Sequence, residues 1–167
     1  MKRFFLLVVC GLVLAVSVQA QGIIAKSPSP ELKVEFKRCI AEEGRAFIDI
    51  LITNASRRDT KIDLSRGWID VYDDEGNVYN NNNITGDEYN VYIASSNVDS
   101  QPLASVVEIP AGIAYKARVI LSGGFDKYAV AVQLLKISFT WNVFNSRTSG
   151  SWETSAIEFR NLPIIRE

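Results

Sequence analysis

Apolar and polar residues alternate with a period of two over most of the chain beyond residue 30. The segment AFIDILITN at 46–54 places three isoleucines on one side and Asp49 and Thr53 on the other. IAYKARVIL at 113–121 and VQLLKISFTWNVF at 132–144 alternate in the same way, and the second puts Trp141 in phase with its apolar residues. Successive side chains of a β-strand point to opposite faces, so each segment predicts a strand with one buried side.

Shorter segments of the same kind lie between these three. No segment past Ala20 repeats its apolar residues every 3.6 positions, as an amphipathic helix would. Turn-forming residues separate the segments, for example AEEG at 41–44 and PAG at 110–112. Many short strands with turn signals between them are typical of an all-β sandwich or barrel. The further strands that we expect are LKVEF (32–36), TKIDLS (60–65), WIDVYD (68–73), NVYN (77–80), NVYIAS (90–95), SVVEI (105–109) and SWETSAIEFRNL (151–162).

The first 20 residues differ from the rest of the chain. Lys2 and Arg3 precede an apolar run at 4–18, and Val18-Gln19-Ala20 has the small residues of a cleavage site. This is the layout of a secretory signal peptide, and the run is shorter than the ~20 apolar residues of a membrane span. We therefore expect a cleaved signal at 1–20, a flexible leader at 21–30 and one domain at 31–167. The domain would be exported to the periplasm or the cell surface, with no membrane span after cleavage.

Charge and composition exclude several classes of function. Loss of Lys2 and Arg3 would change the formal net charge from −1 to −3, and no run of basic residues is present. Neither a nucleic acid nor an anionic membrane is therefore expected as a partner. The chain has no histidine, which removes the commonest general base and the imidazole ligands of zinc sites. Cys39 has no second cysteine in the mature chain, so we expect it half-buried on a strand, without a disulfide.

The stretch WIDVYDDEGNVYNNN at 68–82 concentrates the candidate chemistry. The glycine and asparagine of DEGN are residues that a tight hairpin turn needs, so the simplest interpretation is a turn with solvated acids. A calcium site is a second interpretation, although the EF-hand spacing fails because Val71 and Asn82 would take its two end positions. The candidate calcium ligands are Asp73, Asp74 and Glu75, with Asp87 and Glu88 from the following loop.

A surface that binds a glycan is the third interpretation of this region. Sugar sites combine flat aromatic faces with amides and carboxylates that bind hydroxyl groups, and the Tyr- and Asn-rich loop at 79–92 offers that mixture. Trp68 opens a strand and is expected at its rim, whereas Trp141 is expected in the core. The ligand-binding candidates are Tyr79, Asn82, Tyr89, Tyr92 and Trp152.

Four short motifs follow one another along the chain. They are a strand ending in Thr53-Asn54, DDEGN-Y at 73–79, IPAG at 109–112 and EFRN-P at 158–163. In this order they resemble the exported telokin-like, immunoglobulin-like β-sandwich domains of bacteria, over most of 32–163. The resemblance implies a single immunoglobulin-like antiparallel β-sandwich of roughly seven to nine strands. It implies no catalytic residues and no cofactor, and the Asn-rich insert at 80–90 departs from it.

These observations predict an exported, non-enzymatic interaction module with a protein partner in the cell envelope. Binding would use an exposed sheet edge, by strand addition, or loop tips such as 80–90. A carbohydrate-binding module that uses the loop at 79–92 to hold an extracellular glycan is the alternative. A hydrolase that uses two of the loop carboxylates is a third alternative.

Overall fold

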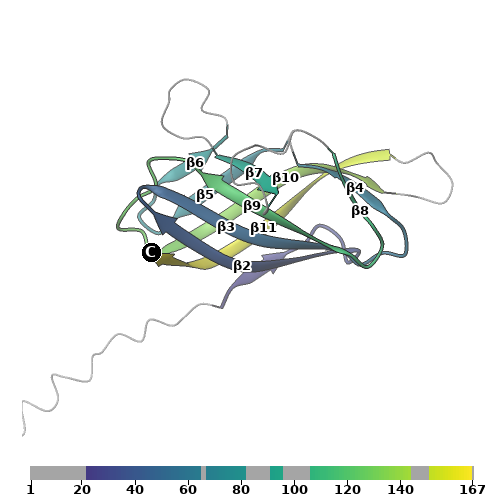
Figure 1. Ribbon diagram of the computed structural model, residues 1–167, viewed down its shortest axis with the longest axis horizontal. Coiled ribbons are helices and arrows are strands. Elements are labelled where there is room, and N and C mark those ends of the chain that lie inside the picture. The colour runs from purple at the N-terminus through teal and green to yellow at the C-terminus, as the bar shows by residue number, and fades with distance from the viewer. Residues whose placement is uncertain (1–21, 65–66, 82–90, 96–105, 144–150, 167) are drawn as a thin grey trace, which may run out of the picture.

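The chain folds into β-strands, as the period-two pattern predicts (Figure 1). A computed structural model describes residues 22–64, 67–81, 91–95, 106–143 and 151–166. These residues contain eleven strands and no helix. The strands are β1 (Ile24–Lys26), β2 (Leu32–Glu42), β3 (Arg45–Asn54), β4 (Thr60–Asp63), β5 (Ile69–Asp73), β6 (Val78–Asn80), β7 (Val91–Ser95), β8 (Val107–Ile109), β9 (Ala114–Leu121), β10 (Ala131–Val143) and β11 (Ser151–Arg166).

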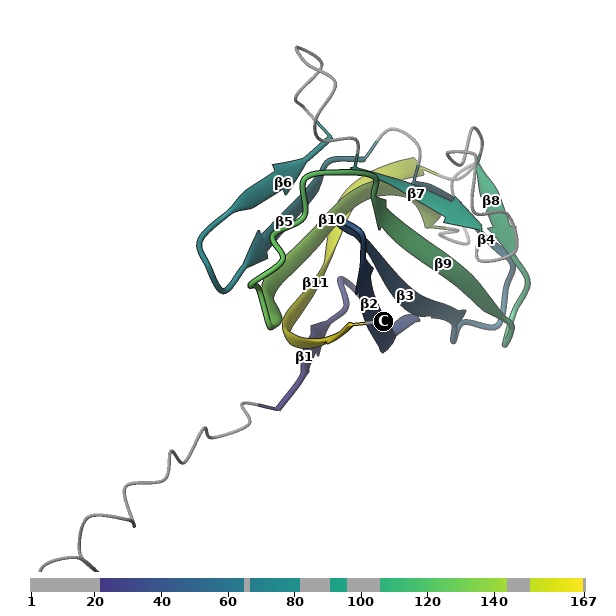
Figure 2. The ribbon, with the colours of Figure 1, turned by 60° about the vertical axis from the view of Figure 1, so that its left-hand side comes forward.

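The strands are arranged in two layers, which Figure 2 shows curving around a common interior. Layer A has the order β6-β5-β10-β11-β1, and β4 and β8 extend it at one end of β10. Layer B has the order β2-β3-β9-β7. All these pairings are antiparallel, so the prediction of an all-β sandwich is confirmed.

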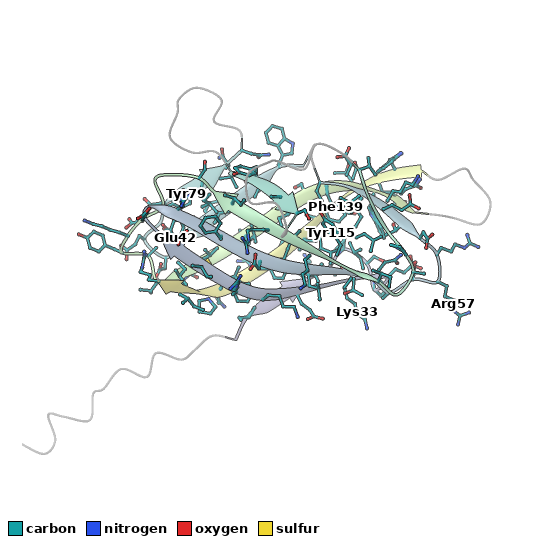
Figure 3. The ribbon with its side chains drawn as sticks, viewed as in Figure 1. Lys33, Glu42, Arg57, Tyr79, Tyr115 and Phe139 are labelled. Carbon is teal, nitrogen blue, oxygen red and sulfur yellow. The ribbon has the colours of Figure 1, made fainter. Side chains whose placement is uncertain are left out.

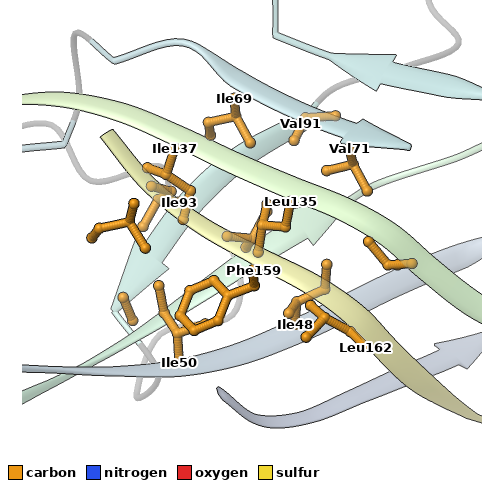
Figure 4. Packing of buried hydrophobic residues seen from close by; sticks show 14 of the residues in the cluster. Ile48, Ile50, Ile69, Val71, Val91, Ile93, Leu135, Ile137, Phe159 and Leu162 are labelled. Atoms are coloured by element: carbon orange, nitrogen blue, oxygen red, sulfur yellow. The ribbon is translucent and has the colours of Figure 1, made fainter. Parts of the chain in front are cut away.

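Apolar side chains from both layers meet between them and form one core (Figure 4). Ile48, Ile50 and Ile52 of β3 are all buried, as the alternation at 46–54 predicts. Phe139 and Trp141 of β10 are buried as well, which confirms the expectation for Trp141. Cys39 is fully buried rather than half-buried, because it lies on the inward side of β2 opposite Ile48.

Strand β11 connects the two layers. Residues 151–163 pair with β10 in layer A, and residues 164–166 pair with β2 in layer B. At the end of the pairing with β10, Asn161 has a φ of 57° and Pro163 lacks an N–H, so the EFRN-P motif lies just before the strand passes from one layer to the other. The β11–β2 pairing is parallel, which departs from the purely antiparallel sandwich that we expected.

The leader at 21–30 is not wholly outside the domain. Ile24–Lys26 forms β1 and pairs with Glu158, Phe159 and Arg160 of β11, which corrects the prediction of a flexible leader. With only three residues, β1 carries too little alternation to be recognised in a sequence, whereas the equally short β6 and β8 lie within the strands expected at 77–80 and 105–109. The described chain therefore has eleven strands, where roughly seven to nine were expected.

Candidate functional site

The acidic turn after β5 is organised around Asp73, which is 3% exposed. Its Oδ1 accepts hydrogen bonds from the backbone N–H groups of Glu75 and Asn77, at 3.0 and 2.8 Å. Its Oδ2 accepts from Asn77 Nδ2 at 2.9 Å and from the Tyr79 hydroxyl at 2.8 Å. Both carboxylate oxygens are therefore occupied by donors from the chain that follows. Gly76 completes the turn with a φ of 88°.

The neighbouring residue Asp74 connects the turn to β10. Its Oδ1 accepts the N–H groups of Val130 and Ala131, at 3.0 and 3.1 Å, and so holds the start of β10 against the hairpin. The tight turn is therefore present, but Asp73 is buried rather than solvated, which corrects that part of the prediction. Within the described residues, no group of three or more His, Cys, Asp or Glu side chains is placed to hold a metal ion. The other two calcium candidates, Asp87 and Glu88, lie outside the described residues.

Tyr79 was expected to face a sugar, and the structure corrects this. Its side chain is 2% exposed, and Figure 3 shows it among the strands near the β5–β6 hairpin. Its hydroxyl donates to Asp73 and accepts the Asp126 N–H at 3.1 Å, while its ring lies 5.2 Å from that of Phe125. Burial, together with the hydrogen bond to Asp73, raises the pKa of Tyr79 above the usual tyrosine range. Tyr79 therefore cannot offer a ring face to a ligand.

The register of the hairpin contained the signal for this. Ile69 and Val71 alternate with Asp70 and Tyr72 in the sequence, which predicts an inward Val71, and the DEGN turn places Tyr79 directly opposite Val71. Directly paired residues of neighbouring strands share a face, so an inward Val71 requires an inward Tyr79.

The remaining sugar-binding candidates do not come together. Asn82 and Tyr89 lie outside the described residues. Tyr92 is half-buried on the outer face of layer B, where it pairs with Ile120. Trp152 is 49% exposed on the outer face of layer A, where it pairs with Asn142. Since the two aromatic side chains lie on opposite faces of the sandwich, one loop-centred site cannot use both.

A different surface crosses the outer face of layer A. Tyr72 pairs with Val78 of β6 and with Leu134 of β10, Leu134 pairs with Arg160 of β11, and Arg160 pairs with Ile24 of β1. We call this line of side chains the open row. Val78 is 48%, Tyr72 38% and Ile24 55% exposed. Five strands at about 4.8 Å spacing make the row about 19 Å long.

A second line of side chains runs beside the open row, two residues away along the strands. Its charges alternate from strand to strand. We call it the charged row, and its members, joined by direct cross-strand pairing, are Asn80, Asp70, Lys136, Glu158 and Lys26. Opposite charges on directly paired strand positions attract one another, so this row also favours the order of the strands.

Two tryptophans extend the same face. Trp68 is 54% exposed and lies four residues before Tyr72, about 13 Å along the strand direction. Its backbone carbonyl accepts the N–H of Ser138 at 2.7 Å, so it continues the pairing of β5 with β10. Trp152 lies at the far end of β10, with Thr140 and Thr154 between the two tryptophans. The expectation of an exposed Trp152 and a rim position for Trp68 agrees with these exposures.

Layer B also has an apolar row on its outer face. Phe47 pairs with Ile40 and Ile120, Ile40 pairs with Ile165, and Ile120 pairs with Tyr92. We call it the covered row, because Ile120 is only 2% exposed and Ile40, Phe47 and Tyr92 are half-buried, although Ile165 at its end is 52% exposed. The guanidinium carbons of Arg45 and Arg118 lie 5.5 and 5.8 Å from the centre of the Phe47 ring.

Comparison with known proteins adds little to this geometry. The chain matches no family model and no curated protein sequence. It is similar to a solved X-ray structure titled target SoR45 of the Northeast Structural Genomics Consortium, with 14% identity, coverage of 83% of this chain and 90% of that one, and a TM-score of 0.47. It is also similar to the ASH / PapD-like domain 7 of human CEP192, with 11% identity, coverage of 84% and 90%, and a TM-score of 0.38. Since both scores are below 0.5, nothing about function is drawn from them.

The described part of the chain has no helix with the length and apolar character of a membrane span.

Proposed function

We propose that the protein is an exported, non-enzymatic binding module that holds a protein partner on the outer face of layer A. The observation that carries the proposal is the open row, in which Val78 and Tyr72 expose apolar surface side by side, and Ile24 exposes more of it beyond Leu134 and Arg160. Contiguous exposed apolar residues with a polar rim are typical of interaction surfaces. The signal-like segment at 1–20 supports export.

The chemistry of the face favours a protein over other partners. Val78 and Ile24 are aliphatic and gain nothing from sugar hydroxyls, whereas apolar side chains of a partner would remove their surface from water. Tyr72 and Trp68 supply the large, rigid aromatic surface that is enriched in protein interfaces. The alternating charges of the charged row would set the orientation of the partner, since complementary charges contribute to specificity.

A glycan remains the second candidate, because of one part of this face. Trp152 is half exposed, and the side chains next to it on the same face carry hydroxyl or amide groups. These side chains are Thr140, Asn142 and Thr154. The Asn142 Oδ1 atom is buried and has no hydrogen-bond partner in the structure. An aromatic ring beside polar groups suits a sugar better than the open row does.

Site-specific photo-crosslinking separates the two candidates. A photoreactive residue in place of Tyr72 should give a discrete protein adduct in the cells that make this protein. The same residue in place of Lys33, an exposed position on layer B, should give none. A Val78→Ser change should reduce the adduct from position 72, because it removes a neighbour in the open row.

The glycan arm uses retention of the purified protein on insoluble polysaccharides. Retention that is lost in Trp152→Ala and kept in Val78→Ser, together with no adduct from position 72, would replace the protein partner by a glycan. An adduct from position 72 that Val78→Ser does not change would show that the open row is not the contact surface.

A further inference from the structure

Strand β2 contains a β-bulge on the outer face of layer B. Phe36 pairs with Ile50 and Arg38 pairs with Asp49, so Lys37 is an extra residue between two consecutive pairs. A bulge of this kind breaks the strict alternation of the strand and re-aims the side chains next to it. Here it places Lys37 and Arg38, two adjacent cations, at the same depression of the surface. Bulges are often found next to functional sites for this reason.

Asp49 of β3 organises the cations around it. Its Oδ2 accepts Arg38 Nε at 2.6 Å, and its Oδ1 accepts Arg118 Nε at 2.6 Å. Arg118 Nη2 makes a further contact with Asp49 Oδ2 at 3.2 Å. One carboxylate therefore fixes two guanidinium groups from neighbouring strands, and the planar guanidinium has further N–H groups with a fixed orientation.

A fourth cation completes the depression from β9. Lys116 lies on the same face as Arg118 and lines a hollow of about 330 Å³ together with Lys37, Arg38, Asp49 and Arg118. Four cationic side chains meet here, against Asp49 and against Glu35, which pairs with Lys37 at 2.6 Å. The whole chain has a formal net charge of −1, so this concentration of positive charge is local.

We propose that this hollow, which we call the anion site, binds an oxyanion group of a ligand: a phosphate, a sulfate or a carboxylate. The planar fork of arginine and the point charge of lysine are the groups that proteins use for such anions. The occupied carboxylate of Asp49 serves as a support that holds the arginines in place. The anion site lies on layer B and is thus independent of the partner surface proposed for layer A.

The sequence hides this site because its cations come from two distant strands. Lys37 and Arg38 are adjacent, but Lys116 and Arg118 are almost 80 positions away and alternate with apolar residues. Strand β3 lies between β2 and β9 and contributes Asp49 to both sides. A chain without a basic run is not expected to bind an extended nucleic acid. The same observation says nothing about a compact site for a single anionic group.

The test is a titration of the purified protein with sodium phosphate, sodium sulfate and sodium acetate at constant ionic strength. Binding is followed by the backbone amide chemical shifts of Lys37, Asp49 and Arg118. The Lys37→Gln/Lys116→Gln double variant should bind about tenfold more weakly, because each ammonium group contributes a charge-assisted hydrogen bond. Lys33→Gln, at an exposed lysine of β2 that does not line the hollow, is the matched control and should bind as the wild type does.

The three anions distinguish the source of the oxyanion. Phosphate preference would indicate a phosphorylated ligand, sulfate preference a sulfated one and acetate preference a carboxylate-bearing one, and each would support the site. Shift changes that are spread over the surface, or equal weakening in Lys33→Gln and in the double variant, would overturn it. An unfolding curve of the double variant that matches the wild type is expected, since neither lysine bonds to Asp49.

Discussion

The two outer faces of the sandwich each have a row of apolar side chains, and the row on layer B is the more covered one, apart from Ile165 at its end. On layer B, two arginines lie over Phe47, and Ile120 is almost inaccessible. On layer A, Tyr72, Val78 and Ile24 lie open, although charged residues pair beside them. Long cationic side chains can cover apolar surface with their stems and their planar heads. Layer B uses Arg45 and Arg118 in this way over Phe47.

The comparison shows that alternation along a strand does not determine the state of its outer face. Both faces have some apolar residues among their outward positions, but the cover comes from neighbouring strands. Asp49 anchors Arg118, which reaches Phe47. Asp70, the acid at the corresponding place in layer A, is paired with Lys136, beside the open row. Layer B therefore covers part of its own outer face, and the open row is the surface to which the proposed partner is assigned.

The largest difference between the two faces is expected when one aromatic ring is removed from each and the losses of stability are compared. Phe47→Ala should lower the free energy of unfolding by about 2 kcal/mol, because a half-buried ring and its two guanidinium contacts are lost. Tyr72→Ala should cost less, about 1 kcal/mol, because Tyr72 is 38% exposed and no arginine is recorded over its ring among the described residues. Urea unfolding of both variants measures the difference. Equal losses would mean that the two rows are equally covered.

The reactivity of the Cys39 thiol measures how often layer B opens, and so it reports the effect of Phe47→Ala from inside the core. Burial raises the pKa of Cys39 to about 12, so the folded protein offers neither a thiolate nor access at pH 8. In a Cys10→Ala background, a thiol reagent should modify Cys39 only when layer B opens. Phe47→Ala should speed the modification roughly thirtyfold, which corresponds to about 2 kcal/mol. Tyr72→Ala should change the rate much less, and a similar acceleration would contradict the distinction between the faces.

The next comparison is between two acids, Asp49→Asn and Asp70→Asn. The first change weakens hydrogen bonds to two arginines and should cost about 1.5 kcal/mol. The second, on the open face, should stay within about 0.5 kcal/mol of the wild type. Thermal and urea unfolding at neutral pH measure both. A larger loss of stability for Asp70→Asn would show that the carboxylate on layer A contributes more to stability than the carboxylate on layer B.

The loss in Asp49→Asn should also depend on pH. Burial works to raise the pKa of Asp49, but hydrogen bonds from Arg118 and Arg38 outweigh it, so the pKa lies below its ordinary value near 3.8. A lowered pKa means that the stabilisation is complete above the ordinary value and is lost as the pH falls through the folded-state value. The stability difference between wild type and Asp49→Asn should therefore shrink below about pH 4. A difference that grows on acidification would contradict this.

The smallest effect concerns the charged row. Lys136→Glu would place three acids side by side on β5, β10 and β11 and should cost about 0.5 kcal/mol. Lys136→Gln is its control, because it removes the cation without adding repulsion. The penalty should diminish when sodium chloride is raised towards 1 M, since salt screens exposed charges. A penalty that salt does not change would indicate lost packing of the lysine stem.

Local patterns predicted most of the strands. The alternation at 46–54 gave β3 to within one residue, and AEEG gave the β2–β3 turn, where Glu43 and Gly44 have φ values of 47° and 77°. Such a two-residue turn is specified by neighbours in sequence. By contrast, β1 depends on residues of β11 that are more than 130 positions away, and Ile113, in phase with β9, is 53% exposed just before that strand begins.

The candidate site was predictable only in part. Trp68, which was expected at the rim of a strand, and Trp152 are both exposed, and each lies next to or near the start of a strand. Tyr79 was misplaced because its loop was interpreted by composition rather than by register. The open row and the anion site could not be found in the sequence. Each is assembled across strands, and strand order is not written in any single segment.

The parallel pairing of β11 with β2 has a consequence for how the chain folds. It joins Cys39 to Ile164, two residues that are 125 positions apart, and it uses the last residues of the chain. The β2–β3 hairpin can form early, but the edge of layer B beside Cys39 stays unpaired until the C-terminal segment arrives. Non-local contacts of this kind slow folding. Closure of the sandwich is therefore expected to be the late, rate-limiting step, and a chain shortened by a few C-terminal residues should fold poorly.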